Sequence, residues 1–157
     1  MDVQGLENLN LEEFSRNLPL VKDLMTSNVF CIPEDAGFDA VRSAMEVNGI
    51  RHLPVINKKR EFVGLITHRD YLMFTVSALA PLSPKEREEF EKNLKVHEFM
   101  QTKVMTVPVH TTLVSAARIM YDNKYGCLPV IEGGMLTGII TESDFLKFFL
   151  KFDVFKS

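Results

Sequence analysis

The 157-residue chain contains an internal repeat, and a duplicated segment builds the same substructure twice. The stretch Val21-Lys-Asp-Leu-Met25 recurs 75 positions later as Val96-His-Glu-Phe-Met100. At the same offset, Leu53-Pro-Val-Ile56 recurs as Leu128-Pro-Val-Ile131. Any fold proposed for the first copy must therefore also accommodate the second.

The second half of the repeat runs at an offset of 74. Gly64-Leu-Ile-Thr-His-Arg-Asp70 matches Gly138-Ile-Ile-Thr-Glu-Ser-Asp144, because the link Asn57-Lys-Lys-Arg-Glu61 shortens to Glu132-Gly-Gly-Met135. Surface turns accept such deletions more readily than strands or helices do. The deletion therefore places a turn between two strands of each copy.

Hydrophobic periodicity predicts the same elements in both copies. Apolar residues at spacings of three and four indicate amphipathic helices, and short β-rich runs that end at Pro33 and Pro108 indicate strands. We expect strands at 28–32 and 103–107, helices at 38–47 and 113–120, hairpins of 52–56 with 62–66 and of 127–131 with 136–140, and closing helices at about 69–79 and from about 143 onward. Each copy then has the order β-α-β-β-α in about 50 residues, too few to bury its own apolar faces. We predict an α+β fold in which both copies pack with pseudo-twofold symmetry into one module.

Three segments lie outside the repeat. Asn10 followed by Glu13 resembles a capping box and predicts a short helix over Leu11–Asn17. In the linker, Ser83-Pro-Lys-Glu86 combines a capping box with proline at the first helical position, which predicts one charged, exposed helix. The chain ends in an aromatic stripe at helical spacing, formed by Phe145, Phe148, Phe149, Phe152 and Phe155. The expected organisation is an N-terminal extension (1–19), a first repeat (20–79), a linker (80–94) and a second repeat with an aromatic C-terminal helix (95–157).

Composition and charge exclude several classes of protein. Eighteen Lys and Arg against 21 Asp and Glu give a net charge of −3, and no basic block stands out, so we do not expect nucleic acid as the main partner. No apolar run approaches the roughly 20 residues that span a bilayer, and the N-terminus lacks a secretory signal, so we expect a cytoplasmic protein with no membrane partner. Cys31 and Cys127 form no C-x-x-C motif and are expected to be reduced, small buried residues.

The repeated motifs V-x-(D/E)-(L/F)-M, L-P-V-I and G-(L/I)-I-T-x-x-D resemble those of paired cystathionine-β-synthase (CBS) domains, together called a Bateman module. The resemblance covers about 20–74 and 95–149. It implies two clefts between the packed repeats, which commonly bind adenosine-containing ligands, and dimers of modules arranged head to head or head to tail. Most relatives regulate an attached enzyme, transporter or channel, whereas we expect this chain to act without an attached domain.

Thr67-His-Arg-Asp70 and Thr141-Glu-Ser-Asp144 lie where a strand is predicted to end and a helix to begin. Such a box caps a helix, because threonine accepts from a first-turn amide and the acid suits the positive helix end. The same position offers amides to a phosphate, and its carboxylate can accept hydrogen bonds from ribose hydroxyls. The family resemblance assigns Asp70 and Asp144 to the ribose, with Thr67 and Thr141 contacting ribose or phosphate. Because two boxes occur at matched positions, we favour binding, which is compatible with capping.

The two copies differ in the cationic side chains around this box. Arg51, His52, His68 and Arg69 accompany Asp70, and an arginine can hold two phosphate oxygens at once. The corresponding residues of the second copy are Gly126, Cys127, Glu142 and Ser143. We predict that the Asp70 site binds nucleotide more tightly, and that the Asp144 site is weaker, prefers a less charged ligand or stays empty. A solvated surface charge is the alternative for Arg51 and Arg69.

By the family pattern, the opening strand of one copy forms the slot for the base at the other copy's ribose site. This pattern assigns Lys103, Val104 and Met105, with Tyr125 nearby, to the Asp70 site, and Asn28, Val29, Phe30 and Ile50 to the Asp144 site. From residue type alone, Val29, Val104 and Ile50 fit a core better than a ligand contact. An aromatic residue at a helix end, such as Tyr125, is also more often a packing residue.

No catalytic or metal-binding motif is present. Each repeat supplies one recurring acid and one recurring hydroxyl, without a nucleophile beside a base, and the four histidines lack paired spacing. We expect neither an enzyme nor a metal site, and no required cofactor.

Two functions remain. The preferred one is a regulatory module that senses an adenosine-containing ligand, such as AMP, ADP, ATP or S-adenosylmethionine, and signals to a separate, unidentified partner protein. The other is a ligand-independent dimerisation or interaction module. In either case, we expect a homodimer formed through the module helices and the phenylalanine stripe. A dinucleotide or cyclic dinucleotide also remains open as the ligand.

Overall fold

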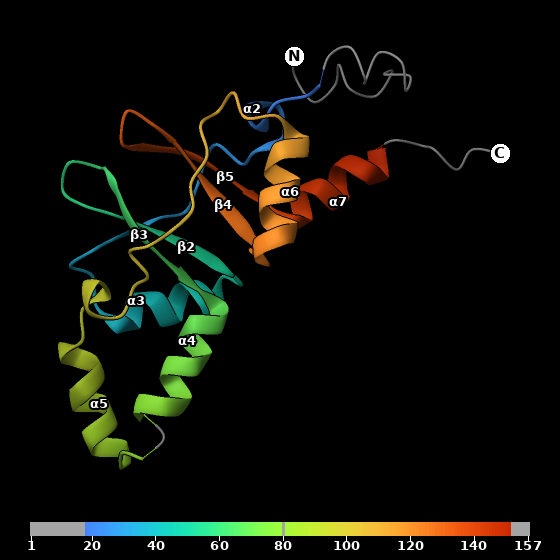
Figure 1. Cartoon of the computed structure of the whole chain (residues 1–157). Coiled ribbons are helices and arrows are strands. Elements are labelled where there is room, and N and C mark those ends of the chain that lie inside the picture. Colours follow the sequence, from blue (N-terminus) through green and yellow to red (C-terminus); the bar gives the residue numbers. More distant parts are fainter. Residues whose placement is uncertain (1–17, 80, 152–157) are drawn as a thin grey trace. The chain divides into compact units, whose positions relative to one another are not determined.

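The computed structural model describes residues 18–79 and 81–151, and the chain divides into two compact units. The unit formed by Phe30–Val104 is called the first-repeat unit, and the unit formed by the residues up to Val29 and from Met105 onward is called the second-repeat unit. Figure 1 shows the path of the chain through both. Each unit combines a β-hairpin with helices, so the fold belongs to the α+β class.

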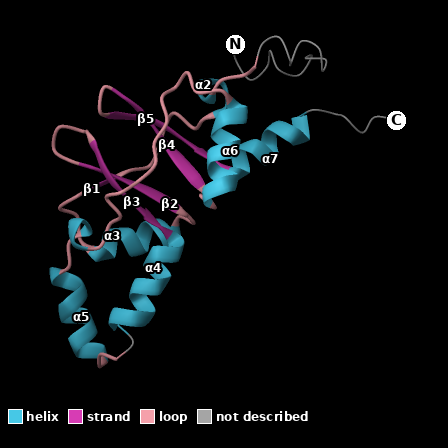
Figure 2. Ribbon diagram, viewed as in Figure 1, coloured by secondary structure: helices cyan, strands magenta, loops and turns pink. Residues whose placement is uncertain are grey.

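A three-stranded sheet forms the centre of the first-repeat unit (Figure 2). Its strands are β1 (Ile32–Pro33), β2 (His52–Ile56) and β3 (Phe62–Thr67). β2 and β3 pair antiparallel as predicted, and β1 adds parallel to β2 with Ile32 opposite Val55. The prediction of a strand over 28–32 is wrong for 28–31, because the ladder begins only at Ile32. Pro33 fits this edge strand because its missing N–H is not needed by a further neighbour.

The predicted helices of the first repeat are present, but each continues into a wider π-helical turn. α3 (Phe38–Arg42) continues as η2 (Ser43–Val47), and α4 (His68–Phe74) continues as η3 (Thr75–Leu79). The N–H of Asn48 donates to the carbonyl of Ser43, five residues earlier, over 3.2 Å. The hydroxyl of Thr75 donates to the carbonyl of Tyr71 over 2.8 Å, a bond that loosens the local helical ladder.

The core of the first-repeat unit surrounds the fully buried ring of Phe38. Its centroid lies 5.5 Å from the ring of Tyr71, 5.6 Å from that of Phe74 and 5.7 Å from that of Phe99. Aromatic pairs at these separations add about 0.5–1.5 kcal/mol each to the free energy gained by burial. Because Phe99 follows η4 (Val96–Glu98), the opening motif of the second repeat is part of the core around the first repeat.

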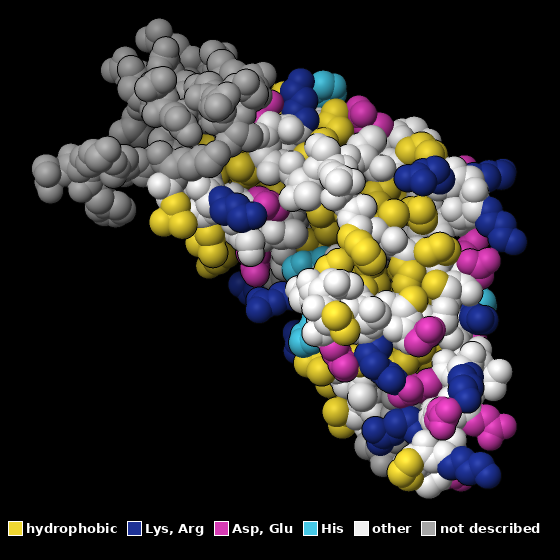
Figure 3. Space-filling view, turned by 180° about the vertical axis from the view of Figure 1, so that it is seen from behind, with side chains coloured by type: hydrophobic (Ala, Val, Ile, Leu, Met, Phe, Trp, Pro, Cys, Tyr) yellow, Lys and Arg dark blue, Asp and Glu magenta, His cyan; other side chains and the backbone are white. Residues whose placement is uncertain are grey.

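The linker forms the charged helix that the sequence predicts, α5 (Pro84–Asn93). Ser83 Oγ accepts from the N–H of Glu86, and the Glu86 carboxylate accepts from the N–H of Ser83 over 2.9 Å, which completes the capping box. Figure 3 shows side chains of both charges interspersed over the region of the chain that includes α5. This helix packs on the first-repeat unit through the stacked rings of Phe74 and Phe90, 6.4 Å apart.

The second-repeat unit repeats this plan around a two-stranded sheet. Its elements are α2 (Val21–Leu24), α6 (Leu113–Asn123), β4 (Cys127–Glu132), β5 (Met135–Thr141) and α7 (Glu142–Lys151). The hairpin and both helices agree with the prediction. The strand predicted over 103–107 is wrong: within it only Val107 pairs, in a single parallel bridge to Val130. The buried core of this unit is formed by Val21, Val107, Val109, Leu113, Ala116, Met120, Leu128, Val130, Ile140 and Phe148.

The two hairpin turns differ as the one-residue deletion predicts. Gly133 and Gly134 both adopt positive φ, 55° and 82°, which is the backbone of the tight two-residue turn between β4 and β5. The longer turn is organised by Asn57, whose Oδ1 accepts from the N–H groups of Lys59 and Glu61 over 2.9 and 3.0 Å. The one-residue difference in length between the two copies therefore lies in the turn and leaves the pairing of the strands unchanged.

The opening motif of each repeat packs with the other repeat's elements. The N–H of Val96 donates to the carbonyl of Ala36 over 3.0 Å within the first-repeat unit. Its counterpart, the N–H of Val21, donates to the carbonyl of Thr111 over 2.7 Å within the second-repeat unit. Each unit therefore contains the opening motif of one sequence repeat and the remaining elements of the other repeat.

Several expectations concern residues at the ends of the chain. The helix predicted over Leu11–Asn17, and Phe152 and Phe155 of the aromatic stripe, lie outside the described residues. Of the rest of the stripe, Phe148 is buried, Phe145 is half-buried and Phe149 is 66% exposed. In the described part of the chain, no helix is both long and apolar enough to cross a bilayer.

The cysteines differ in burial. Both are free, and Cys127 is buried as predicted. The expectation of a buried residue is wrong for Cys31, which is half-buried because it precedes β1 outside the sheet ladder.

Candidate functional site

The turn from β3 into α4 holds the Asp70 carboxylate in a fixed position. Its Oδ2 accepts from the N–H of Thr67 over 3.0 Å and from the Thr67 hydroxyl over 2.5 Å. In return, Thr67 Oγ1 accepts from the N–H of Asp70 over 3.2 Å. The predicted T-x-x-D capping box is therefore confirmed at this position, and its acid remains half-buried rather than enclosed.

The second oxygen of this carboxylate is held by a residue that the sequence reasoning missed. Nε2 of Gln101 donates to Oδ1 of Asp70 over 2.7 Å. Gln101 is brought there by an isolated bridge to Leu65, with both backbone bonds 2.9 Å long. The repeat offered a signal, because Gln101 directly follows the Val96–Met100 motif and corresponds to Thr26, which forms the same bridge to Ile139.

The predicted cationic residues lie at the same end of the hairpin as Asp70. The carbonyl of Arg51 accepts from the N–H of His68 over 2.8 Å, and His52 lies opposite Thr67 in the β2–β3 ladder. The side chains of Arg51 and Arg69 are exposed, whereas those of His52 and His68 are half-buried. Two exposed arginines thus lie, along the backbone, next to the helix start that carries the capped carboxylate.

The amides at the start of α4 are largely committed to the protein itself. The N–H of His68 donates to Arg51, and the N–H of Asp70 donates to Thr67. Phosphate binding at this helix start therefore depends more on the arginine side chains than on a row of backbone amides.

The second repeat contains a similar cap at the start of α7. Oδ2 of Asp144 accepts from the N–H of Thr141 over 2.9 Å and from its hydroxyl over 2.8 Å. The N–H of Glu142 donates to the carbonyl of Gly126 over 3.2 Å, as His68 does to Arg51. Asp144 is only 6% exposed, and Nζ of Lys147 lies 3.8 Å from its Oδ1.

The two caps therefore differ in charge and accessibility. The Asp144 carboxylate is buried and has a lysine close by, whereas Asp70 is half-buried and contacts a neutral amide. Burial, with a smaller contribution from the negative charge of Glu142, raises the pKa of Cys127 to about 12, so this thiol is neutral at pH 7. Glu142 and a neutral thiol offer a phosphate none of the attraction that Arg51 and Arg69 provide in the first repeat.

The residues predicted to hold the base divide between the two units. Lys103 and Val104 belong to the same unit as Asp70, and Asn28 and Val29 to the same unit as Asp144. Met105 and Tyr125 belong to the second-repeat unit, and Phe30 and Ile50 to the first-repeat unit, so each is in the other unit from the carboxylate it was assigned to. Ile50 packs against the first-repeat core, in agreement with the core alternative.

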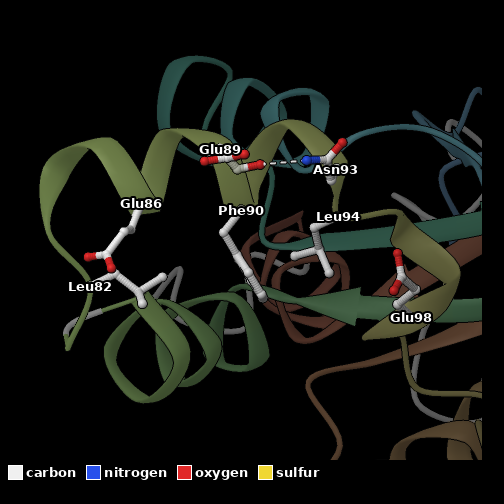
Figure 4. Close-up of a pocket in the computed structure, with 7 residues that line it drawn as sticks. All are labelled: Leu82, Glu86, Glu89, Phe90, Asn93, Leu94 and Glu98. Carbon is white, nitrogen blue, oxygen red and sulfur yellow. Dashed lines mark hydrogen bonds between the residues drawn. The ribbon is translucent and has the colours of Figure 1, made fainter.

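A groove of about 470 Å³ lies beside α5, and none of its lining residues belongs to either cap (Figure 4). Its apolar floor comes from Leu82, Phe90 and Leu94, and its rim carries carboxylates. The acidic lining residues are Glu86, Glu89 and Glu98. Because three carboxylates without a lining cation repel phosphate, this groove is not a suitable site for a nucleotide.

The described residues contain no group of three or more His, Cys, Asp or Glu side chains that could hold a metal ion. The chemistry available at the two caps is hydrogen bonding by a carboxylate, with ion pairing by the exposed arginines in the first repeat and by Lys147 in the second.

Comparison with known proteins identifies relatives of both repeats. The family model of the CBS domain matches residues 21–76 and 96–151. A CBS domain-containing protein of Dictyostelium discoideum is 33% identical over 133 residues, covering 84% of this chain and 92% of that protein. An inosine-5'-monophosphate dehydrogenase of Staphylococcus saprophyticus is 31% identical over 148 residues, covering 90% of this chain but only 27% of that enzyme.

Solved structures with a similar fold contain adenosine compounds. The CBS domain pair of protein MJ0100, in complex with 5'-methylthioadenosine and S-adenosyl-L-methionine, has a TM-score of 0.70 and 19% identity over 85% of this chain and 97% of that one. The protein CBSX2, in complex with AMP, has a TM-score of 0.70 and 23% identity over 84% of this chain and 96% of that one. At these identities, the likeness establishes the fold.

Proposed function

The chain belongs to the CBS domain family, with two repeats, and we propose that it is a regulatory module that binds an adenosine-containing ligand and signals to a separate partner protein. The observation that carries this proposal is the Asp70 carboxylate, held half-buried at the start of α4 beside two exposed arginines. The AMP and S-adenosyl-L-methionine complexes of proteins with the same fold support an adenosine compound as the ligand.

Each group of the first-repeat cap has a role in this proposal. The Asp70 carboxylate accepts hydrogen bonds from the two ribose hydroxyls, and Thr67 holds it in the required orientation. Arg51 and Arg69 pair with phosphate oxygens, and His52 and His68 add donors. Lys103, Val104, Met105 and Tyr125 remain the candidates for the base slot. Regulation follows if the ligand binds one conformation of the module more tightly than another.

The second cap is proposed as the weaker site. Thr141 and Asp144 repeat the ribose-binding pair, with Ser143, Asn28, Val29, Phe30 and Ile50 as further candidates. However, Asp144 is buried, and Glu142 and Ser143 replace the histidine and the arginine of the first repeat. A ligand with less negative charge than ATP, or none, fits these surroundings.

Isothermal titration calorimetry with AMP, ADP, ATP and S-adenosylmethionine tests the proposal. We expect saturable binding near one ligand per chain, which Asp70→Asn weakens by at least about tenfold, because a neutral amide loses a charge-assisted hydrogen bond. Asp144→Asn is the matched control, because it makes the same change in the other cap. Far-UV circular dichroism verifies that both variants stay folded.

Either of two results contradicts the proposal. One is the absence of heat and of any change in melting temperature with all four ligands at millimolar concentration. The other is a loss of binding in Asp144→Asn that equals or exceeds the loss in Asp70→Asn, which would contradict the assignment of the stronger site.

A ligand-independent dimerisation or interaction module is the second candidate. It is favoured by apolar exposure on α7, where Leu146, Phe149 and Leu150 are 63%, 66% and 84% exposed. If this face mediates a homodimer, Leu146→Asp with Leu150→Asp yields a monomer by analytical ultracentrifugation while nucleotide binding persists. A dimer that survives both substitutions contradicts the use of this face.

A further inference from the structure

Backbone contacts at the start of each repeat's opening motif are duplicated. The N–H of Phe38 donates to the carbonyl of Leu94 over 3.2 Å, and the N–H of Leu113, 75 positions later, donates to that of Pro19 over 2.9 Å. The bonds of Val96 to Ala36 and of Val21 to Thr111 correspond in the same way, as do those of His97 to Glu34 and of Lys22 to Val109. The chain therefore enters the two units along the same path.

In the first-repeat unit, the residues before Leu94 form α5. This helix packs on the helices of the first repeat through the stack of Phe90 on Phe74 and the ion pair of Glu91 with Arg42. A groove of about 330 Å³ lies there, with Arg42, Glu46, Tyr71 and Thr75 on one side and Pro84, Arg87, Glu88 and Glu91 of α5 on the other. The linker helix thus supplies one wall of this groove.

The second-repeat unit has a corresponding groove. It has a volume of about 520 Å³ and lies between α6 and α7. Its lining residues are Ala117, Met120, Tyr121, Lys124, Glu142, Phe145 and Leu146. Ala117, Tyr121 and Phe145 stand at the repeat positions of Arg42, Glu46 and Tyr71, so this groove is the more apolar of the two.

The repeat offset also identifies the counterpart of α5. Residues 84–93 correspond to residues 9–18, which directly precede Pro19 and include the helix predicted over Leu11–Asn17. On such a helix, Leu11 and Phe14 fall at i and i+3 and share one apolar face, and Leu18, which follows the helix, is 43% exposed. Glu91, the ion-pair partner of Arg42, corresponds to Arg16, while Arg42 corresponds to Ala117. The ion pair is thus replaced on both sides of the contact.

We propose that residues 9–17 form an amphipathic helix that covers the α6–α7 groove, as α5 covers the corresponding groove of the first repeat. Leu11 and Phe14 contact the apolar wall around Phe145 and Leu146. The connection is short, because Pro19 already bonds to the first residue of α6. A covered groove and a homodimer formed through the same groove exclude each other, so this proposal is distinct from both functions considered above.

Limited trypsin digestion tests this proposal on the full chain, because Arg16 lies within the segment. We expect slow release of the peptide 1–16 from the wild-type protein, and release roughly tenfold faster from Leu146→Asp and from Phe14→Asp, since each places a charge in the apolar contact. Leu72→Asp is the matched control, because Leu72 is the repeat counterpart of Leu146 and is 47% exposed. It leaves the release rate unchanged.

Hydrogen exchange followed by mass spectrometry gives an independent measurement. Amides of residues 11–18 are protected in the wild-type protein and lose protection in Leu146→Asp but not in Leu72→Asp. Wild-type amides that exchange as fast as those of an unstructured peptide overturn the proposal, as does equal trypsin cleavage of the wild type and Leu146→Asp. Protection that rises with protein concentration overturns it as well, because it assigns the groove to a second copy.

Discussion

The side-chain amide of Gln101 donates to Oδ1 of Asp70 over 2.7 Å, which links the opening motif of the second repeat to the helix cap of the first. The other carboxylate oxygen of Asp70 is occupied by Thr67. A ribose that binds Asp70 must therefore share Oδ1 with Gln101 or displace it. The position of Gln101 thus controls the acceptor that the proposed ligand requires.

Gln101→Glu is expected to weaken nucleotide binding. The substitution places a second carboxylate against Asp70 and adds a negative charge near the phosphate-binding arginines. Repulsion of about 1 kcal/mol reduces affinity roughly fivefold at pH 7, as measured by calorimetry with the tightest of the four ligands. Thr26→Glu is the control, because Thr26 is the counterpart of Gln101 in the second-repeat unit. Equal affinity in wild type and Gln101→Glu would remove Gln101 from the site.

Gly64→Ala is expected to disturb the segment that carries Gln101. A Cβ at Gly64 lies 2.8 Å from the carbonyl oxygen of Gln101 and 2.6 Å from Sδ of Met100, so the backbone must shift. At the counterpart Gly138, the nearest atoms all belong to the flexible side chain of Met25. We expect Gly64→Ala to lower the free energy of unfolding by about 2 kcal/mol and Gly138→Ala by about 1 kcal/mol.

Urea denaturation and calorimetry measure these two effects. Gly64→Ala weakens ligand binding as well as stability, because it moves Gln101, whereas Gly138→Ala leaves binding at the first cap unchanged. A larger loss of stability in Gly138→Ala than in Gly64→Ala contradicts the role assigned to the Gln101 backbone.

The sequence predicts features that depend on neighbouring residues. Alternating apolar residues and turn residues place both hairpins, and the T-x-x-D and Ser83–Glu86 patterns place the helix caps. These features form through interactions within a few positions, so local patterns are sufficient to predict them.

The sequence does not predict features that depend on pairing between distant segments. Gln101 reaches Asp70, 31 positions away, only because Gln101 and Leu65 form a bridge. The short strand at Ile32 is also decided by its partner Val55 rather than by its own β propensity. To predict the Gln101–Asp70 contact and the strand at Ile32, one must already know with which repeat each opening segment packs. The π-helical turns Ser43–Val47 and Thr75–Leu79 were missed because each is only five residues long, which is too short to change the apolar spacing of the helix it continues.

Tyr71→Phe tests the hydrogen bond that links α4 to η2. The Tyr71 hydroxyl donates to Oε1 of Glu46 over 2.5 Å, and burial together with the negative charge of Glu46 raises the pKa of Tyr71 above its ordinary value. Removal of the hydroxyl is expected to lower the free energy of unfolding by about 1 kcal/mol at pH 7, measured by urea denaturation.

The pH dependence of Tyr71→Phe follows from the direction of that pKa shift. A folded-state pKa above the unfolded value stabilises the protein fully below about pH 10, and this contribution is lost as the pH rises through the folded-state pKa. The stability difference between wild type and Tyr71→Phe therefore shrinks above about pH 10. A difference that stays constant or grows with alkaline pH contradicts this assignment.

The two cysteines are expected to differ in reactivity, because only Cys127 is buried. Its pKa of about 12 leaves a negligible thiolate fraction at pH 8, and the thiolate is the reactive form. With a disulfide reagent at pH 8, one thiol per chain, Cys31, reacts within minutes, and the second reacts only when the protein unfolds. Cys31→Ser removes the fast phase and leaves the slow one.

The raised pKa of Cys127 also predicts the effect of alkaline pH on its reaction. Because the folded state binds this proton more tightly than the unfolded state does, the stabilisation is complete below about pH 9 and is lost as the pH rises towards 12. The slow phase therefore accelerates between about pH 9 and 12, both because thiolate forms and because unfolding becomes easier. A fast phase that persists unchanged in Cys31→Ser contradicts the burial of Cys127 beside the second cap.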